Sequence, residues 1–198
     1  MKKYDVAIIG GGISGIMCAY RLTESNPALA VALIEKGHAI TGRVCPIIKK
    51  TADHCVKCPS CAIMEGMAGA GAFSDGKYVI STEYGGWLTD FLEPETVIDY
   101  IEQADRLLVS FGATTERFMP NNDLKAECLK YDLHMSQAQL KHLGTDENFD
   151  TMRKMIEHIS EKCDIYTDAD VTDVDAAVHT IFAQTKSGSM EFQAKDII

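Results

Sequence analysis

The sequence lacks a hydrophobic run long enough to cross a membrane as a helix. The longest candidate, residues 6–20, falls short of the roughly 18 residues that a span needs, and glycines dilute it. The basic start at Met1 to Lys3 is followed by Asp5 and by no small-residue cleavage site, so we expect no secretory signal. The sequence therefore predicts a protein without a membrane segment, located in the cytoplasm.

Positive charge is also scarce. Lysine and arginine total 19 against 29 aspartates and glutamates, which gives a net charge of -10 and a pI near 5.0. Such a chain would repel the phosphate backbone of nucleic acid and an anionic bilayer. We therefore expect neither as a partner. A hydrophobic fraction of 46% indicates a globular protein.

Several catalytic signatures are absent as well. The sequence has no H-E-x-x-H pair, no phosphate loop of the G-x4-G-K-[ST] kind and no Ser-His-Asp order. Its carboxylates show no pairing suggestive of glycoside hydrolysis. The sequence therefore gives no sign of these four kinds of catalytic site.

A strand, a glycine turn, a helix and a second strand are predicted in the first 36 residues. Residues 4–9 form a β-branched apolar run, and Gly-Gly-Gly-Ile-Ser-Gly follows at residues 10–15. Apolar residues then recur at helical spacing, and a second apolar run at residues 31–35 ends in Glu35. This is the spacing of a dinucleotide-binding βαβ unit. The sequence predicts an α/β fold with a Rossmann-like FAD- or NAD(P)-binding domain.

Each residue of this motif has a predicted role. Gly10 permits the tight turn, Gly12 lets the backbone approach a pyrophosphate, and Gly15 lets the helix pack on the strand. The helix start at Ser14 faces the phosphates, because its free N–H groups favour anionic oxygens. Glu35 would accept hydrogen bonds from ribose hydroxyls and repel a 2′-phosphate, which disfavours NADP. The alternative is a glycine turn that binds no ligand.

The residues after Glu35 favour FAD over NAD. The N-terminal placement of the motif and the sequel Glu35-Lys36 with Gly42-Arg43 resemble flavoproteins of the glutathione-reductase-like superfamily. In that superfamily a downstream Gly-Arg approaches the flavin pyrophosphate. The resemblance implies that Lys36, Gly42 and Arg43 belong to the FAD site.

Four of the seven cysteines cluster in a segment at residues 43–62. They have the spacing C-x9-C-x2-C-x2-C, and they are Cys45, Cys55, Cys58 and Cys61. In a reducing compartment such a cluster favours metal or thiol chemistry over structural disulfides. Four thiolates suffice for an iron–sulfur cluster or zinc. A redox-active thiol pair and inert reduced cysteines remain as alternatives.

A glycine- and alanine-rich segment follows at residues 66–76. Its backbone could lie flat against a ligand, or its small residues could form a packing seam. The run from Gly69 to Lys77, after the cysteines and the glycine turn, resembles a group of bacterial FAD-dependent dehydrogenases within the same superfamily, as does the run from Lys141 to Asp146. The resemblance covers the whole chain and implies FAD contacts at Gly71, Ala72, Phe73 and Ser74. It assigns no catalytic residue.

The second half of the chain is predicted to hold helices and then short strands. Amphipathic helices are expected at residues 94–111, 123–131 and 149–159. Strands are expected at residues 163–167, 171–174, 178–185 and 190–194, with the last two as a hairpin. His142, before Gly144, Thr145 and Asp146, is expected to lie in a polar loop, and an acid or base role near a flavin is the alternative.

These patterns predict three parts in an N-terminal portion of a longer flavoprotein. They are an FAD-binding portion at residues 1–90, a mainly helical excursion on the substrate side at residues 91–162, and a β-meander at residues 163–198 that returns to the nucleotide-binding domain. The predicted function is an FAD-dependent oxidoreductase that acts with a small-molecule substrate or an electron-transfer partner, with a nicotinamide as candidate reductant. The alternatives are a non-catalytic nucleotide-binding fragment that needs a partner chain, and a cysteine-based metal or redox sensor.

Overall fold

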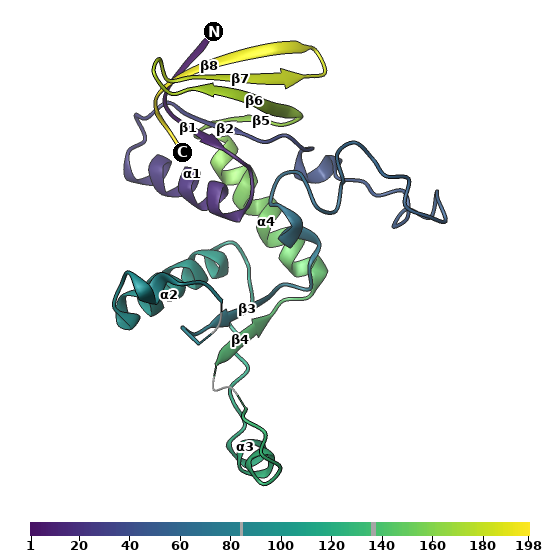
Figure 1. Cartoon of the computed structure of the whole chain (residues 1–198), viewed down its shortest axis with the longest axis vertical. Coiled ribbons are helices and arrows are strands. Elements are labelled where there is room, and N and C mark those ends of the chain that lie inside the picture. The colour runs from purple at the N-terminus through teal and green to yellow at the C-terminus, as the bar shows by residue number, and fades with distance from the viewer. Residues whose placement is uncertain (84, 136–137) are drawn as a thin grey trace. The chain divides into compact units, whose positions relative to one another are not determined.

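The structure, a computed structural model, describes residues 1–83, 85–135 and 138–198 (Figure 1). The chain divides into two compact units. Unit 1 comprises Met1–Phe73 and Met152–Ile198, and unit 2 comprises Ser74–Thr151. Within the described ranges no helix is both long enough and apolar enough to cross a membrane.

Unit 1 is built on a six-stranded sheet in the order β5-β2-β1-β8-β7-β6. Its strands are β1 (Lys2–Ile9), β2 (Val31–Ile34), β5 (Asp164–Tyr166), β6 (Ala169–Asp175), β7 (Thr180–Thr185) and β8 (Gly188–Ile197). The first four in this order pair in parallel, whereas β8, β7 and β6 pair antiparallel. This sheet, with α1 (Ile13–Ser25) between β1 and β2, confirms the predicted α/β fold and the β7–β8 hairpin.

Strand β2 and residues 6–8 of β1 are buried, which explains why these stretches are continuously apolar. On one face Ala7, Ala32 and Ile34 form a core with residues of the meander such as Phe192. Because side chains alternate along a strand, Leu33 faces the opposite side. Buried residues on the helices complete the interior of unit 1, and these include Ile16, Ala19, Met155 and Ile159.

Strand β8 is longer than the sequence predicts and pairs with two other strands. Its first part pairs antiparallel with β7, and its last part, from Phe192 onward, pairs in parallel with β1. The pattern predicted a strand that stops at Ala194, but the strand continues to Ile197 because β1 offers it a second partner. Ile198 then exchanges main-chain hydrogen bonds with Ala7 and Ile9, at 2.9 and 2.8 Å. The chain thus returns to the residues just before the glycine turn.

Unit 2 contains a two-stranded antiparallel sheet, β3 (Lys77–Ile80) with β4 (Gln139–His142), and the helices α2 (Pro94–Ser110) and α3 (Asn122–Leu129). Helix α4 (Thr145–Ser160) begins in unit 2 and ends in unit 1. The three predicted helices are confirmed. The polar loop expected at His142 is wrong, because His142 is the last residue of β4 and pairs with Lys77.

Candidate functional site

The glycine turn after β1 is closed by contacts that only glycine permits. Gly10 has a φ of +108°, in the region that favours glycine, and its N–H donates to the Ile34 carbonyl oxygen at 2.8 Å. A Cβ added to Gly15 would stand 2.0 Å from the Gly10 carbonyl oxygen. A Cβ added to Gly12 would meet nothing within 4 Å. The main chain is therefore closely packed at Gly15, whereas there is open space next to the Cα of Gly12.

Helix α1 begins at this turn with its N-terminal N–H groups uncapped. Gly12 is the N-cap, no side chain accepts a hydrogen bond there, and the first turn holds no acidic residue. A pocket of about 490 Å³ lies over the turn and is lined by Ile8, Ile9, Gly10, Gly12, Ile13, Ser14, Gly15, Cys18 and Ile198. Uncapped N–H groups and the positive end of the helix dipole favour negatively charged oxygen atoms in such a pocket.

Residues 62–69, the 62–69 loop, lie against the glycine turn. The Ala68 N–H donates to the Gly11 carbonyl oxygen at 2.7 Å, and a Cβ on Gly69 would stand 3.5 Å from the Gly12 Cα. Gly66, Ala68 and Gly69 all have positive φ, at 111°, 71° and 64°. Ala68 is the notable case, because a residue with a Cβ is held there only by its surroundings.

Glu35 is buried, with 7% of the residue exposed, and its carboxylate binds main-chain N–H groups. Oε2 accepts from Gly11 at 2.8 Å, and Oε1 accepts from Gly37 at 2.8 Å and from Gly66 at 3.1 Å. The carboxylate therefore joins the glycine turn, the end of β2 and the 62–69 loop. Its contact with a ribose stays a prediction.

Arg43 is also buried, with 5% exposed, and its guanidinium binds main-chain carbonyl oxygens. All four hydrogen bonds, between 2.7 and 2.9 Å, go to the 62–69 loop, to Ala62, Ile63, Met67 and Gly69. Its Cζ also lies 4.7 Å from the centre of the Phe73 ring. Burial lowers the pKa of Arg43, and Glu35 and Cys61 partly offset this. A contact with a pyrophosphate stays a prediction.

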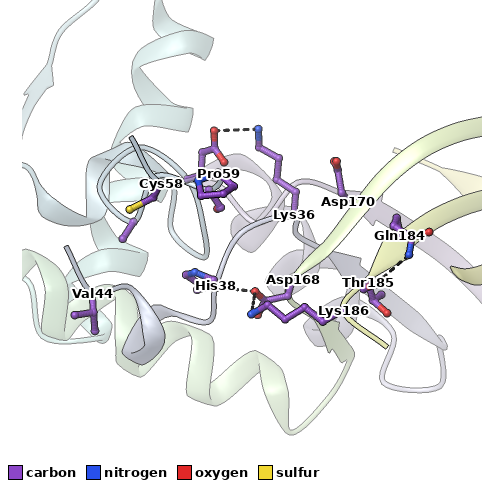
Figure 2. Close-up of a pocket in the computed structure, with 13 residues that line it drawn as sticks. Lys36, His38, Val44, Cys58, Pro59, Asp168, Asp170, Gln184, Thr185 and Lys186 are labelled. Atoms are coloured by element: carbon purple, nitrogen blue, oxygen red, sulfur yellow. Dashed lines mark hydrogen bonds and ion pairs between the residues drawn. The ribbon is translucent and has the colours of Figure 1, made fainter. Parts of the chain in front are cut away.

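A second pocket of unit 1, the β2-end pocket, has a volume of about 540 Å³ (Figure 2). Lys36 and His38, which follow β2, line it together with Cys58 and with residues of the meander. Lys36 Nζ lies 3.2 Å from Glu65 Oε1, so the predicted site residue Lys36 is engaged in an ion pair at the pocket wall. The first of its lining residues, Lys36, directly follows Glu35 in the sequence.

Within this pocket three side chains meet that no pattern in the sequence predicted to lie together. His38 Nδ1 lies 2.6 Å from Asp168 Oδ1, and Lys186 Nζ lies 2.9 Å from the same oxygen (Figure 2). Burial raises the pKa of Asp168, but hydrogen bonds from Lys186 and His38 outweigh it, and the net pKa is lowered. His38 and Asp168 are 130 positions apart, and no spacing in the sequence could have predicted their contact.

The four clustered cysteines do not form a metal site in the part of the chain that the structure describes. No group of three or more His, Cys, Asp or Glu side chains there is arranged to hold a metal ion. Cys55 and Cys58 are exposed, and Cys45 and Cys61 are half-buried. The expected iron–sulfur or zinc ligation therefore finds no support in this geometry, because the thiols do not converge.

The remaining predicted contacts lie in or near a short 3-10 helix at Ala70–Phe73. Ala72 is fully buried, whereas Gly71 is exposed and has open space where a Cβ would be. Ser74 begins unit 2, and its hydroxyl accepts a hydrogen bond from the Gly76 N–H. Gly42 is exposed at the end of another 3-10 helix, Ile40–Gly42. Flavin contacts at these residues stay predictions.

Unit 2 holds a buried charge cluster that the sequence did not predict. Lys141 and Asp105, with 1% and 5% exposed, form an ion pair of 2.6 Å, and Lys141 also donates to the Thr114 carbonyl oxygen at 2.8 Å. Arg117 binds Asp105 at 2.7 Å and both carboxylate oxygens of Glu102. The two cations and two anions compensate one another, so the cluster needs no ligand to balance its charge.

The comparisons with known proteins support a flavin site in unit 1. Residues 5–43 match the family profile DAO, described as FAD dependent oxidoreductase. The matched segment begins in β1 and ends at Arg43, so it contains the whole glycine turn. No curated protein matches the chain.

Solved structures with the same fold include dehydrogenases and reductases. Quinol fumarate reductase FrdA from E. coli is 14% identical, with a TM-score of 0.57 over 100% of this chain and 32% of that one. A 3-ketosteroid-delta4-(5alpha)-dehydrogenase from Rhodococcus jostii is 13% identical, with a TM-score of 0.55 over 98% of this chain and 44% of that one. THI4 from Thermovibrio ammonificans is 14% identical, with a TM-score of 0.53 over 98% and 55%.

The chain spans about a third to just over half the length of these structures. At such low identity the likeness establishes the fold alone. Together with the family match at residues 5–43, it shows that the chain has the Rossmann-like FAD-binding fold of flavoprotein oxidoreductases.

Proposed function

We propose that this chain is the FAD-binding part of an oxidoreductase, with the FAD pyrophosphate over the glycine turn at residues 10–15. One observation carries the proposal: the open, uncapped start of α1 lies inside the segment that matches the FAD-dependent oxidoreductase profile. A pocket lies at the same place, so the position that the family match favours is also one that can receive a ligand.

The residues present fit a bound diphosphate. Open space above Gly12 lets phosphate oxygens approach the backbone, and the first turn of α1 offers N–H donors with no acidic side chain to repel the anion. The exposed Ser14 hydroxyl is a further donor within the same turn. In this proposal the protein neutralises the pyrophosphate with its backbone and needs no lysine there.

The two ends of the dinucleotide would leave the turn in different directions. We assign the adenosine half to the β2-end pocket, because that pocket is lined by Lys36 and His38, just after Glu35. We assign the flavin half to the segment from Gly71 to Ser74, on the resemblance of this segment to FAD-dependent dehydrogenases.

When bound, FAD would supply the hydride or electron chemistry, and this chain would bind and orient it. The proposed co-reactants are a small-molecule substrate or an electron-transfer partner, with a nicotinamide as a candidate reductant. The similar structures include a ketosteroid dehydrogenase and a fumarate reductase, and because one fold serves such different substrates, we carry over neither. The proposal includes no metal, since the described cysteines form no ligand set.

A graded substitution at Gly12 tests this proposal. Its φ of -71° suits any residue and its Cβ meets nothing, so Gly12→Ala and Gly12→Val should fold normally while they fill the space for phosphate. FAD is titrated into each 198-residue chain and followed by flavin fluorescence. We expect affinity to fall from wild type to Gly12→Ala to Gly12→Val, by about tenfold or more for the valine. Ser25→Val adds the valine at the other end of α1 and should bind like wild type. Equal affinity across the series would reject the proposal.

A further inference from the structure

The 62–69 loop has a main chain that is buried but forms no helix or strand. Ala62, Met67 and Ala68 are all buried, and the loop belongs to no regular element. Buried main-chain N–H and C=O groups need partners, and a loop without a ladder must find them elsewhere. In this protein two side chains of opposite charge supply much of that need.

Glu35 binds main-chain N–H groups, and Arg43 binds main-chain carbonyl oxygens. The Glu35 carboxylate accepts from the N–H of Gly66, and from two N–H groups outside the loop. The Arg43 guanidinium donates to four carbonyl oxygens within the loop. Charged groups make stronger hydrogen bonds than neutral ones, so the five contacts that reach the loop fix it at five residues, Ala62, Ile63, Gly66, Met67 and Gly69.

From this arrangement we infer that Glu35 and Arg43 are positioning residues, which hold the 62–69 loop against the glycine turn as a second wall of the dinucleotide site. In this role they act on FAD through the loop. The inference rests on the proposed FAD function, and it gives both residues a role beyond the ribose and pyrophosphate contacts expected from the sequence.

Two observations support action through the loop. Both side chains are buried, and the Arg43 guanidinium uses four of its five N–H groups on carbonyl oxygens of the loop. The loop itself reaches the turn, because Ala68 donates to Gly11 and Gly69 approaches Gly12. The positive φ of Ala68 indicates a loop that its contacts force into place.

Three substitutions distinguish the effect of the loop position from the effect of the two charged side chains. Glu35→Gln places an NH2 donor against N–H donors, and Arg43→Lys replaces a planar fork by a single ammonium. Gly66→Ala leaves both charges intact, but its Cβ would stand 2.8 Å from the His38 carbonyl oxygen and 2.8 Å from Arg43 Cδ, so the loop must shift. Glu24→Gln is the matched control, because Glu24 binds the side chains of His158 and Lys162 and not the main chain.

The first readout is hydrogen exchange of residues 62–69 in the chain without FAD. We expect exchange to rise by about tenfold or more in the three variants and to stay at the wild-type rate in Glu24→Gln. The second readout is FAD affinity by fluorescence titration, which should fall by a similar factor in the same three variants. The third is the visible circular dichroism of bound FAD, which should change where the wall has moved and which a purely structural role would not alter.

The outcomes distinguish this inference from the proposed function. Weaker FAD binding in Glu35→Gln with unchanged loop exchange would indicate a direct contact and overturn the inference. Faster exchange with FAD affinity within twofold of wild type would overturn it too, since the loop would then be no part of the site. Absence of FAD binding in the wild type would reject the proposed function, and the exchange rates would still decide whether the two side chains anchor the loop. If Gly66→Ala does not fold, Ala68→Gly loosens the same loop without strain.

Discussion

An added Cβ on Gly15 would stand 2.0 Å from the carbonyl oxygen of Gly10, and this contact explains why helix α1 can follow β1 so closely. The atom it would meet belongs to the main chain, which cannot rotate away as a side chain could. Glycine at position 15 is thus a requirement of the fold before it is a requirement of any ligand.

The first prediction follows from this contact. Gly15→Ala should lower the free energy of unfolding by about 3 kcal/mol, because the strand and the helix must separate to admit the methyl group. Gly42→Ala is the matched control, since its Cβ would lie at an ordinary 3.7 Å from the His38 Cβ and should change stability by less than about 0.5 kcal/mol. Chemical denaturation measures both. Equal stability of the two variants would contradict the packing described for the turn.

The second prediction concerns the charge cluster of unit 2. Asp105→Asn leaves Lys141 buried without its anion, and should cost about 3–5 kcal/mol of unfolding free energy. Glu102→Gln removes a partly exposed partner of Arg117, which keeps Asp105, and should cost about 1 kcal/mol or less. Denaturant titrations that found the two variants equally stable would show that Asp105 is not the centre of the cluster.

The third prediction concerns Tyr78, whose hydroxyl is buried and has no hydrogen-bond partner among the residues that the structure describes. Tyr78→Phe should therefore be neutral or more stable by about 1 kcal/mol. Burial, with help from the charges of Asp105 and Glu147, raises the pKa of Tyr78 to about 12. The folded state holds this proton more tightly than the unfolded state does. The free energy of unfolding is therefore not reduced by ionisation of Tyr78 below the ordinary pKa of 10.0, and it falls as the pH rises above that value.

The measurement is the unfolding free energy of wild type and Tyr78→Phe over this alkaline range. The wild type should lose more stability than Tyr78→Phe as the pH passes from about 9 to about 11. Parallel pH profiles for the two proteins would argue that the phenol is solvated.

The βαβ unit could be predicted from the sequence because each of its signals is local. The apolar run before Gly10, the glycines and the acid at the end of β2 all occur within 36 residues, and the structure places the strands and helix where the pattern did. The strands β3 and β4 could not be predicted in this way. Each has only four residues, and the buried Lys141 in β4 is a residue type that patterns assign to the surface.

The geometry of the candidate site was predictable only in part. The glycine turn follows from its spacing. The partners of Glu35 and Arg43 are main-chain groups, most of them in the 62–69 loop, and the identity of a residue does not show which main-chain group a distant side chain will bind. His38 and Asp168 meet only because β5 joins the sheet beside β2. Long-range contacts of this kind depend on the assembled sheet, which local patterns do not specify.

The fourth prediction concerns the cysteines. Cys55 and Cys58 are exposed and should react first with an alkylating reagent in the native protein. Cys163 should react last, because burial raises the pKa of its thiol to about 11. Mass spectrometry of timed samples gives the order. Protection of Cys55 and Cys58 that a chelator removes would instead reveal a bound metal, and would contradict the open arrangement of these thiols.

Amide chemical shifts from an isotope-labelled chain test most directly whether a dinucleotide binds at the start of α1. On titration with FAD, we expect the largest shifts on residues 10–15 and on residues 66–73. An unchanged spectrum at saturating FAD, or shifts confined to other residues, would contradict it.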